Sequence, residues 1–258
     1  MPQPPCYVAT QTIVILLKTL PPRGGSCTIG TGILSTIHGR PSGGRLALRA
    51  VVFDYGMVLS GPQEPTAYAA LLRITGLPKE RFESLYWADR PAYDEGKLTG
   101  IAYWRKFLRE AELPPDEEKV EELNQWDARM WTTENPAMLA WQLELKQRGL
   151  LTGILSNIGD AVTASVELKL DWIHRFDALV WSYRLGIAKP DPAIYRHILS
   201  KLGTQADETL FLDDKPVNVE AARAVGMRAI EFSTVARLRA DLIALGLEAE
   251  LPLPATIS

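Results

Sequence analysis

Four groups of polar residues in this sequence have the residue types that phosphoryl-transfer chemistry requires. Each follows a short apolar segment or lies in the loop after one: Asp54, Ser156 with Asn157, Lys189, and Asp213 with Asp214. A carboxylate can attack phosphorus and form a covalent intermediate, and neighbouring carboxylates suit Mg²⁺, which prefers oxygen ligands. A hydroxyl and an ammonium group can hold the remaining phosphoryl oxygens, where charge stabilisation contributes most to catalysis. The residue types therefore predict a Mg²⁺-assisted site with Asp54 as nucleophile.

The elements that must position these groups alternate between helices and strands from residue 136 onward. Strands are predicted at 150–155, 178–181, 209–212 and 228–232, in addition to the apolar run that ends at Phe53. Helices are predicted between them, with Asp160 and Asp191 as N-caps and Gly149, Gly226 and Gly246 as stops. This alternation indicates an α/β fold with a Rossmann-like parallel sheet and right-handed crossovers. The carboxyl ends of parallel strands lie along one edge, so we expect the polar groups to meet there.

Each polar group also has an ordinary structural explanation when it is taken alone. Ser156 could be a turn residue, Lys189 a solvated loop residue, and the pair Asp213 and Asp214 a helix cap. Together these explanations are poor, because chance would have to place all the groups at the same end of successive apolar strands. The joint pattern favours a functional site.

The segment between the first two strands has a different character from the rest of the chain. Residues 62–135 carry four predicted helices and no strand signal, which indicates an inserted all-helical cap domain with a hinge near Glu134. The sheet domain would then comprise residues 47–61 and 136–247. Residues 1–46 are rich in Gly, Pro, Ser and Thr and contain no acidic residue, so we expect a disordered N-terminal extension. Residues 248–258 read as a C-terminal tail.

Composition excludes several classes of protein. The formal net charge of −3 gives no general attraction to nucleic acid or to anionic membranes. Two cysteines and three scattered histidines provide neither a disulfide framework nor a clustered metal site. No apolar run is long enough to span a bilayer. We expect a soluble cytoplasmic protein, a monomer or a homodimer, that acts on a small phosphorylated metabolite.

The order of these motifs resembles the haloacid dehalogenase superfamily, in the subclass with a helical-bundle cap inserted after the first strand. The matching stretches are 51–59, 154–157, 186–195 and 211–222, and the resemblance covers about residues 48 to 245. It implies that Asp54 is the nucleophile and that Lys189 and Ser156 bind the phosphoryl group. It also implies that Asp54 and Asp214 ligate Mg²⁺, with Asp213 as a second acidic partner. We further expect Asn157 to contact the substrate.

One position departs from the pattern of that superfamily. Its phosphatases usually carry a second aspartate two positions after the nucleophile, as general acid and base, whereas this chain has Gly56. The Gly56 carbonyl can still reach a metal ion, but a glycine cannot transfer a proton. General acid catalysis contributes about 10²- to 10⁴-fold. We therefore predict a preference for substrates whose leaving oxygen needs little protonation, such as anomeric sugar phosphates or acyl phosphates.

Specificity is expected to come from the cap, where the stretch 87–93 combines aromatic residues with an arginine. Arg90 and Tyr93 are the candidates for substrate contact. In the alternative interpretation, Trp87 and Tyr93 pack inside the helical bundle and Arg90 pairs with Asp89 or Asp94.

Two other functions remain open at this point. A haloacid dehalogenase would use Asp54 to displace halide, but by resemblance such enzymes need no metal and carry Ser and Asn where this chain has Asp213 and Asp214. A non-catalytic protein that binds a phosphorylated ligand would not need a nucleophile. These observations favour a Mg²⁺-dependent phosphate monoester hydrolase.

Overall fold

A computed structural model describes residues 47–254 of the chain. The predicted N-terminal extension, residues 1–46, and residues 255–258 lie outside this range. The strands are β1 (Ala50–Phe53), β2 (Leu151–Ser156), β3 (Ala178–Trp181), β4 (Thr209–Asp213) and β5 (Arg228–Glu231). The helices of the sheet domain are α6 (Pro136–Gln147), α7 (Asp160–Lys169), α8 (Ser182–Leu185), α9 (Pro192–Leu202), α10 (Pro216–Ala224) and α11 (Val235–Ala244).

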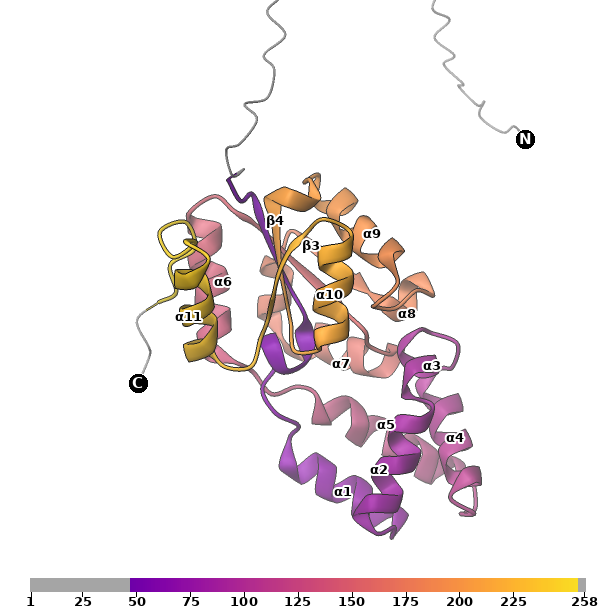
Figure 1. The fold of residues 1–258 in the computed structure, drawn as a ribbon. Helices are drawn as coiled ribbons and strands as arrows, with labels where there is room; N and C mark the ends of the chain where they lie inside the picture. Colours follow the sequence, from indigo (N-terminus) through magenta and orange to yellow (C-terminus); the bar gives the residue numbers. More distant parts are fainter. Residues whose placement is uncertain (1–46, 255–258) are drawn as a thin grey trace, which may run out of the picture. The chain divides into compact units, whose positions relative to one another are not determined.

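Within residues 47–254, the strands form one parallel sheet in the order β3-β2-β1-β4-β5. The first strand in the chain is therefore the central one. Helices α6 and α11 cover one face of the sheet, and α9 and α10 cover the other (Figure 1). This arrangement confirms the predicted α/β fold with a Rossmann-like parallel sheet.

The central strand β1 supplies both hydrophobic cores because successive side chains of a strand point to opposite faces. Val51 and Phe53 belong to the core beneath α6 and α11, whereas Ala50 and Val52 belong to the core beneath α9 and α10. The Phe53 ring meets Trp141 of α6 edge to face, with 5.7 Å between the ring centroids. Burial on both faces explains why this strand reads as a continuous apolar run.

Directly after β1 the chain makes a tight turn, Tyr55–Leu59, which the sequence did not reveal and which a hydrogen bond from Ser60 N–H to the Tyr55 carbonyl closes at 2.8 Å. The Asp54 side chain accepts a hydrogen bond from the Tyr55 backbone N–H at 2.7 Å, so the carboxylate is held at the start of this turn. Met57, in the middle of the turn, has φ 59°. The nucleophile candidate therefore lies at a rigid junction between the strand and the turn.

The cap consists of α1 (Pro65–Thr75), α2 (Lys79–Ala88), α3 (Arg90–Asp94), α4 (Gly100–Glu110) and α5 (Glu117–Met130). The four predicted helices are present, and the short helix α3 is additional. Side chains of Glu64, Thr99 and Asp116 accept hydrogen bonds from the first turns of α1, α4 and α5. These caps satisfy backbone N–H groups that helix starts leave without partners.

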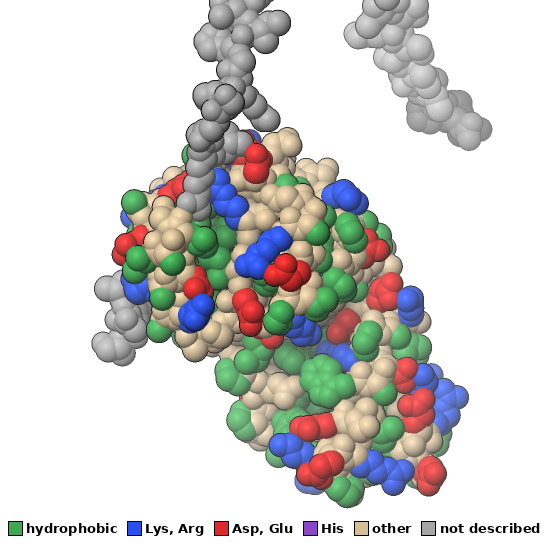
Figure 2. Space-filling model, in the orientation of Figure 1, with side chains coloured by type: hydrophobic (Ala, Val, Ile, Leu, Met, Phe, Trp, Pro, Cys, Tyr) green, Lys and Arg blue, Asp and Glu red, His purple; other side chains and the backbone are tan. Residues whose placement is uncertain are grey.

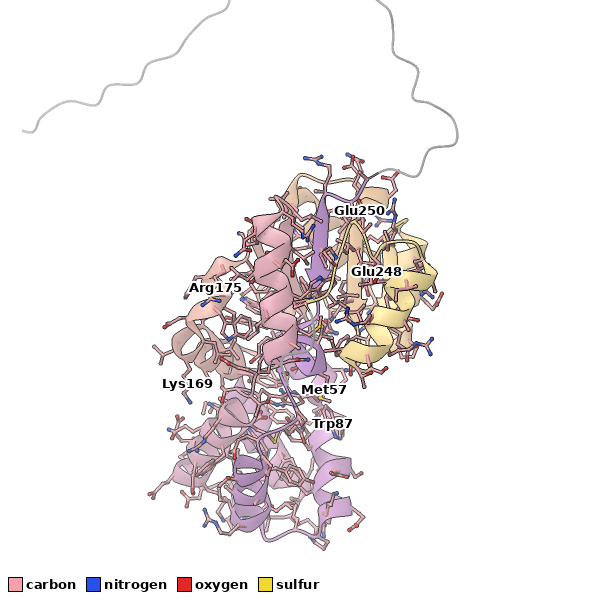
Figure 3. The ribbon with its side chains drawn as sticks, turned by 90° about the vertical axis from the view of Figure 1, so that its left-hand side faces the viewer. Met57, Trp87, Lys169, Arg175, Glu248 and Glu250 are labelled. Atoms are coloured by element: carbon pink, nitrogen blue, oxygen red, sulfur yellow. The ribbon has the colours of Figure 1, made fainter. Side chains whose placement is uncertain are left out.

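Two linkers join the cap to the sheet domain, and they run side by side. Backbone hydrogen bonds join Gly61 N–H to the Thr133 carbonyl at 3.3 Å and Asn135 N–H to the Leu59 carbonyl at 2.9 Å. The cap also contacts the sheet domain on another side, where the Asp160 carboxylate of α7 accepts from Gly100 N–H at 2.9 Å. Met57 and Trp87 lie at the junction between the two parts (Figure 3).

Two local details differ from the sequence predictions. Gly159 is the N-cap of α7, and Asp160 is the first residue of the helix. Leu251 and Leu253, expected in a tail, are buried in the core beside α11.

Side chains of both charge signs are spread over the visible face (Figure 2). Within the described range no helix has the length and apolarity needed to cross a bilayer.

Candidate active site

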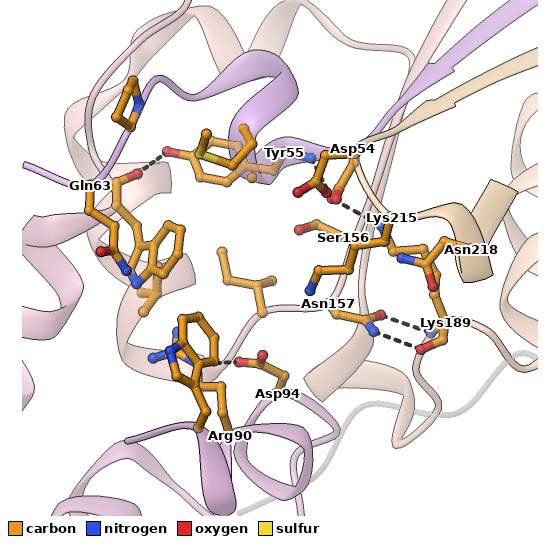
Figure 4. Close-up of a pocket in the computed structure, with 18 residues that line it drawn as sticks. Asp54, Tyr55, Gln63, Arg90, Asp94, Ser156, Asn157, Lys189, Lys215 and Asn218 are labelled. Atoms are coloured by element: carbon orange, nitrogen blue, oxygen red, sulfur yellow. Dashed lines mark hydrogen bonds and ion pairs between the residues drawn. The ribbon is translucent and has the colours of Figure 1, made fainter. Parts of the chain in front are cut away.

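A cavity of about 410 Å³ lies where the carboxyl edge of the sheet faces the cap. The tips of β1, β2 and β4 deliver Asp54, Ser156 and Asp214 to its wall, and the loop before α9 delivers Lys189. These side chains are far apart in the sequence, and the strand order places them on neighbouring central strands. The structure therefore brings the predicted groups together around one cavity (Figure 4).

The Lys189 ammonium group is the centre of the contacts at this edge. Its side chain is 1% exposed, and its Nζ donates to Asp213 Oδ2 at 2.6 Å and to the Leu155 carbonyl at 2.9 Å. It also forms an ion pair with Asp54 Oδ1 at 3.0 Å. Three donors on the ammonium thus meet three acceptors, which fixes the position of the charge next to Asp54.

Asn157 holds the Lys189 backbone in place. Its side-chain Nδ2 donates to the Lys189 carbonyl, and its Oδ1 accepts from the Lys189 N–H, both at 2.8 Å. Asn157 was predicted to contact the substrate, and it does line the cavity. Its hydrogen bonds, however, make it a clamp on the loop that carries Lys189. The pairing could not be read from the sequence because 32 residues separate the two positions.

The Asp213 carboxylate is fully buried and surrounded by donors. Besides Lys189, it accepts from Asn218 Nδ2 at 3.0 Å and from the Lys215 backbone N–H at 2.9 Å. These contacts make Asp213 the group that positions and neutralises Lys189. Its predicted part in metal binding stays a prediction.

The site fits a divalent cation. Carboxylate oxygens of Asp54, Asp213 and Asp214 lie within 4.8 Å of one another. Asp213 is occupied by its donors, so Asp54 and Asp214 are the carboxylates left to face an ion. Two carboxylates, a backbone carbonyl such as that of Gly56 and several waters make the oxygen shell that Mg²⁺ favours.

Burial has a strong effect on the acids of this site. Desolvation raises the pKa of the Asp54 carboxyl to about 7, although the Lys189 ammonium lowers it. Desolvation and the nearby Asp213 also raise the pKa of Asp214. A cation bound between these carboxylates would favour their ionised forms.

Gly56 is not required by the local backbone or by its neighbours. Its φ of −62° and ψ of 130° are accessible to any residue. A Cβ atom built on Gly56 would meet nothing within 4 Å, and the residue lines the cavity. The glycine therefore leaves open space at the position where the superfamily's general acid would stand.

The structure separates the two cap residues that were predicted to contact substrate. Arg90 lines the cavity but pairs with Asp94 and Asp127, each at 3.0 Å. Tyr93 is fully buried, stacks on Tyr103 with 5.1 Å between the ring centroids, and does not line the cavity. The alternative interpretation was closer for these residues, since Tyr93 packs and Arg90 pairs with Asp94.

Several lining residues were not among the predicted site residues. Trp87, in the stretch 87–93 that was expected to give specificity, is 48% exposed and lines the cavity instead of packing in the bundle. Lys215 and Asn218 lie two and five positions after Asp213, at the start of α10, so their proximity to the site could have been inferred from the helix that starts there. Trp131 lies in the second linker, where no pattern indicated contact with the site.

Comparison with known proteins shows the family of the chain. Residues 48–226 match haloacid dehalogenase-like hydrolases. Phosphatase MT3486 of Mycobacterium tuberculosis is 32% identical over 190 residues, which are 71% of this chain and 87% of that protein. Bifunctional epoxide hydrolase 2 of Mus musculus is 28% identical over 232 residues, and these make up 81% of this chain but only 41% of that longer relative.

Solved structures show the same fold. The HAD family enzyme bt-2542 of Bacteroides thetaiotaomicron aligns with a TM-score of 0.62 over 75% of this chain and 98% of its own, at 17% sequence identity. At this identity the likeness concerns the fold alone. The motifs, the fold and the matched residues lead to the same conclusion: the chain belongs to the haloacid dehalogenase-like hydrolase family, and it is a hydrolase.

Proposed function

We propose that the protein is a Mg²⁺-dependent phosphatase that hydrolyses a small phosphate monoester through an aspartyl-phosphate on Asp54. The observation that carries this proposal is the position of Asp54 at the tip of the central strand. Its carboxylate lies 3.0 Å from the Lys189 ammonium and within 4.8 Å of the carboxylates of Asp213 and Asp214. The 32% identity to a protein named as a phosphatase supports the same reaction class.

In the first step, an Asp54 carboxylate oxygen attacks phosphorus. A bond forms between that oxygen and phosphorus while the ester P–O bond breaks, and the substrate alcohol leaves as its anion and takes a proton from solvent water. The Ser156 hydroxyl binds a phosphoryl oxygen, and the Lys189 ammonium, 3.0 Å from Asp54 Oδ1, stabilises the negative charge of the phosphoryl group. In the second step, water attacks the aspartyl-phosphate, which releases inorganic phosphate and restores Asp54. Mg²⁺ held by Asp54 and Asp214 would neutralise phosphoryl charge.

The leaving alcohol receives no proton from residue 56, because a glycine stands there. The proposed enzyme therefore favours substrates whose leaving oxygen is a weak base and can depart as an anion. This property follows from the missing side chain at Gly56, since general acid catalysis matters least for such leaving groups.

A dehalogenase is the competing catalytic function. It would need Asp54 as nucleophile but no cation. The pair Asp213 and Asp214 favours the phosphatase, because Asp214 has no role at the sheet edge that we can assign other than holding a cation. A non-catalytic binding protein is disfavoured because Asp54 and Lys189 form a complete nucleophile site.

The test is phosphate release from a panel of phosphate monoesters and acyl phosphates, measured with Mg²⁺ and with EDTA. The wild-type protein and the isosteric variant Asp54→Asn are compared in parallel, with circular dichroism as a check of folding. We expect release by the wild type with Mg²⁺ and none by the variant or in EDTA. Halide release from haloacids, with no phosphate release from any compound, would instead assign the protein as a dehalogenase.

A further inference from the structure

The part of the cavity that faces the cap is mostly apolar, in contrast to the charged sheet edge. The apolar side chains that line it are Met57, Pro62, Trp87, Trp131, Ile158 and Val162. Met57 is 44% exposed and Trp87 is 48% exposed, although large apolar side chains are usually buried in a folded protein. Both lie at the junction of the cap and the sheet domain (Figure 3), where Figure 2 shows hydrophobic side chains in the hollow between these parts.

The backbone at Met57 holds its side chain in this place. Met57 has φ 59°, a left-handed conformation that is unfavourable for a residue with a side chain. The Met57 N–H donates to the Ser60 hydroxyl at 3.0 Å, which stabilises the turn. Strained residues of this kind concentrate at functional sites. The turn after the nucleophile therefore keeps a large apolar side chain at the cavity in spite of an energetic cost.

The two tryptophans are also held in place, and both contact the same buried residue. The Trp87 ring meets Tyr86 edge to face with 4.9 Å between the ring centroids. The Trp131 indole N–H donates to the Tyr86 hydroxyl at 3.3 Å. Tyr86 itself is 2% exposed and donates to Asp127 at 2.7 Å. The aromatic wall is thus anchored in the cap core and does not depend on a ligand.

Charged groups on the cap side of the cavity already have partners. Arg90 pairs with Asp94 and Asp127, so this cluster of one cation and two acids offers no excess positive charge for a second anionic group. Among the described residues of the cap and its linkers that line the cavity, Gln63 has the only amide side chain and none has a hydroxyl group. A sugar, whose many hydroxyl groups would lose their water partners, is poorly matched to this wall. The wall therefore disfavours the anomeric sugar phosphates that Gly56 alone would allow.

We propose that the alcohol part of the substrate is a compact apolar aryl group that packs against Met57, Trp87 and Trp131. This inference rests on the proposed phosphatase function and names its substrate class. An aryl oxygen also needs less protonation on leaving than a saturated alkyl oxygen, in agreement with Gly56. The volume of about 410 Å³ is near the lower end of the range of about 300–1,000 Å³ for small-molecule sites, so the group is compact.

The experiment compares kcat/KM for phenyl phosphate and naphthyl phosphate, whose leaving groups have similar basicity but different apolar area. Glucose 1-phosphate serves as the polar ester. Acetyl phosphate has no ring to pack against the wall, so its turnover measures the phosphoryl-transfer reaction alone. Burial of apolar surface is worth about fourfold in binding per methylene group. We therefore expect naphthyl phosphate to exceed phenyl phosphate by roughly tenfold or more, and glucose 1-phosphate to be the poorest ester.

Two tryptophan variants test whether the preference for naphthyl phosphate comes from the cavity wall. Trp87→Ala is expected to lower the ratio of naphthyl to phenyl phosphate turnover at least threefold. Trp126→Ala removes an indole from α5 that does not line the cavity, and it is expected to leave the ratio unchanged. Circular dichroism and acetyl phosphate turnover show that each variant is folded.

The outcomes separate this inference from the proposed function. Asp54-dependent turnover of acetyl phosphate without a preference for the naphthyl ester, or with a preference for glucose 1-phosphate, would overturn the apolar substrate class alone. An unchanged ratio in Trp87→Ala would also overturn it. Absence of turnover with every phosphate would overturn both proposals together.

Discussion

Replacement of Gly56 by aspartate would test whether the chain lacks only a proton donor. The backbone at Gly56, with φ −62° and ψ 130°, accepts any residue, and an added Cβ atom meets nothing within 4 Å. The new carboxyl group would enter the cavity that Gly56 lines, two positions beyond Asp54. We therefore expect Gly56→Asp to fold normally and to gain a general acid.

The expected gain depends on the leaving group. General acid catalysis contributes about 10²- to 10⁴-fold, which equals about 3–5 kcal/mol of activation free energy. This gain should appear with alkyl phosphates, whose leaving oxygen needs a proton, and should be small with acyl phosphates. The assay is kcat/KM across a series of phosphate esters of increasing leaving-group basicity, measured with Mg²⁺.

The matched control is Gly56→Asn, which has nearly the same shape but cannot deliver the proton. If the aspartate variant and the asparagine variant give the same rates, the gain does not come from proton transfer. If Gly56→Asp raises the rates of alkyl and acyl phosphates by the same factor, the explanation of substrate preference by the missing acid is wrong.

Three further predictions concern stability and metal binding. Lys189→Met leaves the buried Asp213 carboxylate without its ion-pair partner and should lower the free energy of unfolding by about 3–5 kcal/mol. Urea titration measures this loss, and a loss below about 1 kcal/mol would contradict the assigned ion pair. Gly159→Ala should cost about 1–3 kcal/mol, because its Cβ would overlap the Tyr93 ring, and Tyr93→Leu should recover most of this loss if the overlap is the cause. Mg²⁺ at a hundred times its Kd should stabilise the wild type against thermal unfolding by about 2.7 kcal/mol. The same Mg²⁺ concentration should stabilise Asp214→Asn less, and an equal stabilisation would exclude the Asp214 carboxylate as a ligand.

The sheet and the position of its polar edge could be predicted because local sequence patterns determine them. The apolar run that ends at Phe53 is buried on both faces, and Asp54 follows it at the strand tip. The start of α9 was equally clear, since Asp191 accepts from Ala193 N–H at 2.8 Å as an N-cap before Pro192. In each case the signal lies within a few residues of the feature.

Features that depend on contacts between distant segments could not be predicted. The clamp of Asn157 on the Lys189 backbone joins two loops. The burial of Tyr93 depends on a glycine at position 159 that leaves room for its ring. The left-handed backbone at Met57 has no sequence signal, because methionine is not a residue that favours such a conformation. These contacts shape the cap side of the cavity, which is also where substrate selection is proposed to occur.

The proposed monomeric or dimeric state and cytoplasmic location stay predictions from the sequence. They do not affect the chemistry at Asp54, because every group assigned to that chemistry comes from one chain.

Chemical trapping of the phosphorylated enzyme tests most directly whether Asp54 is the nucleophile. The protein is mixed with acetyl phosphate and Mg²⁺, quenched with acid during turnover, and analysed by intact mass and by peptide mapping after borohydride reduction of the acyl phosphate. We expect the wild type to gain the mass of one phosphoryl group and to show a reduced residue at Asp54, and we expect no label on Asp54→Asn. A phosphoryl group on another residue, or turnover without label at Asp54, would show that Asp54 is not the nucleophile.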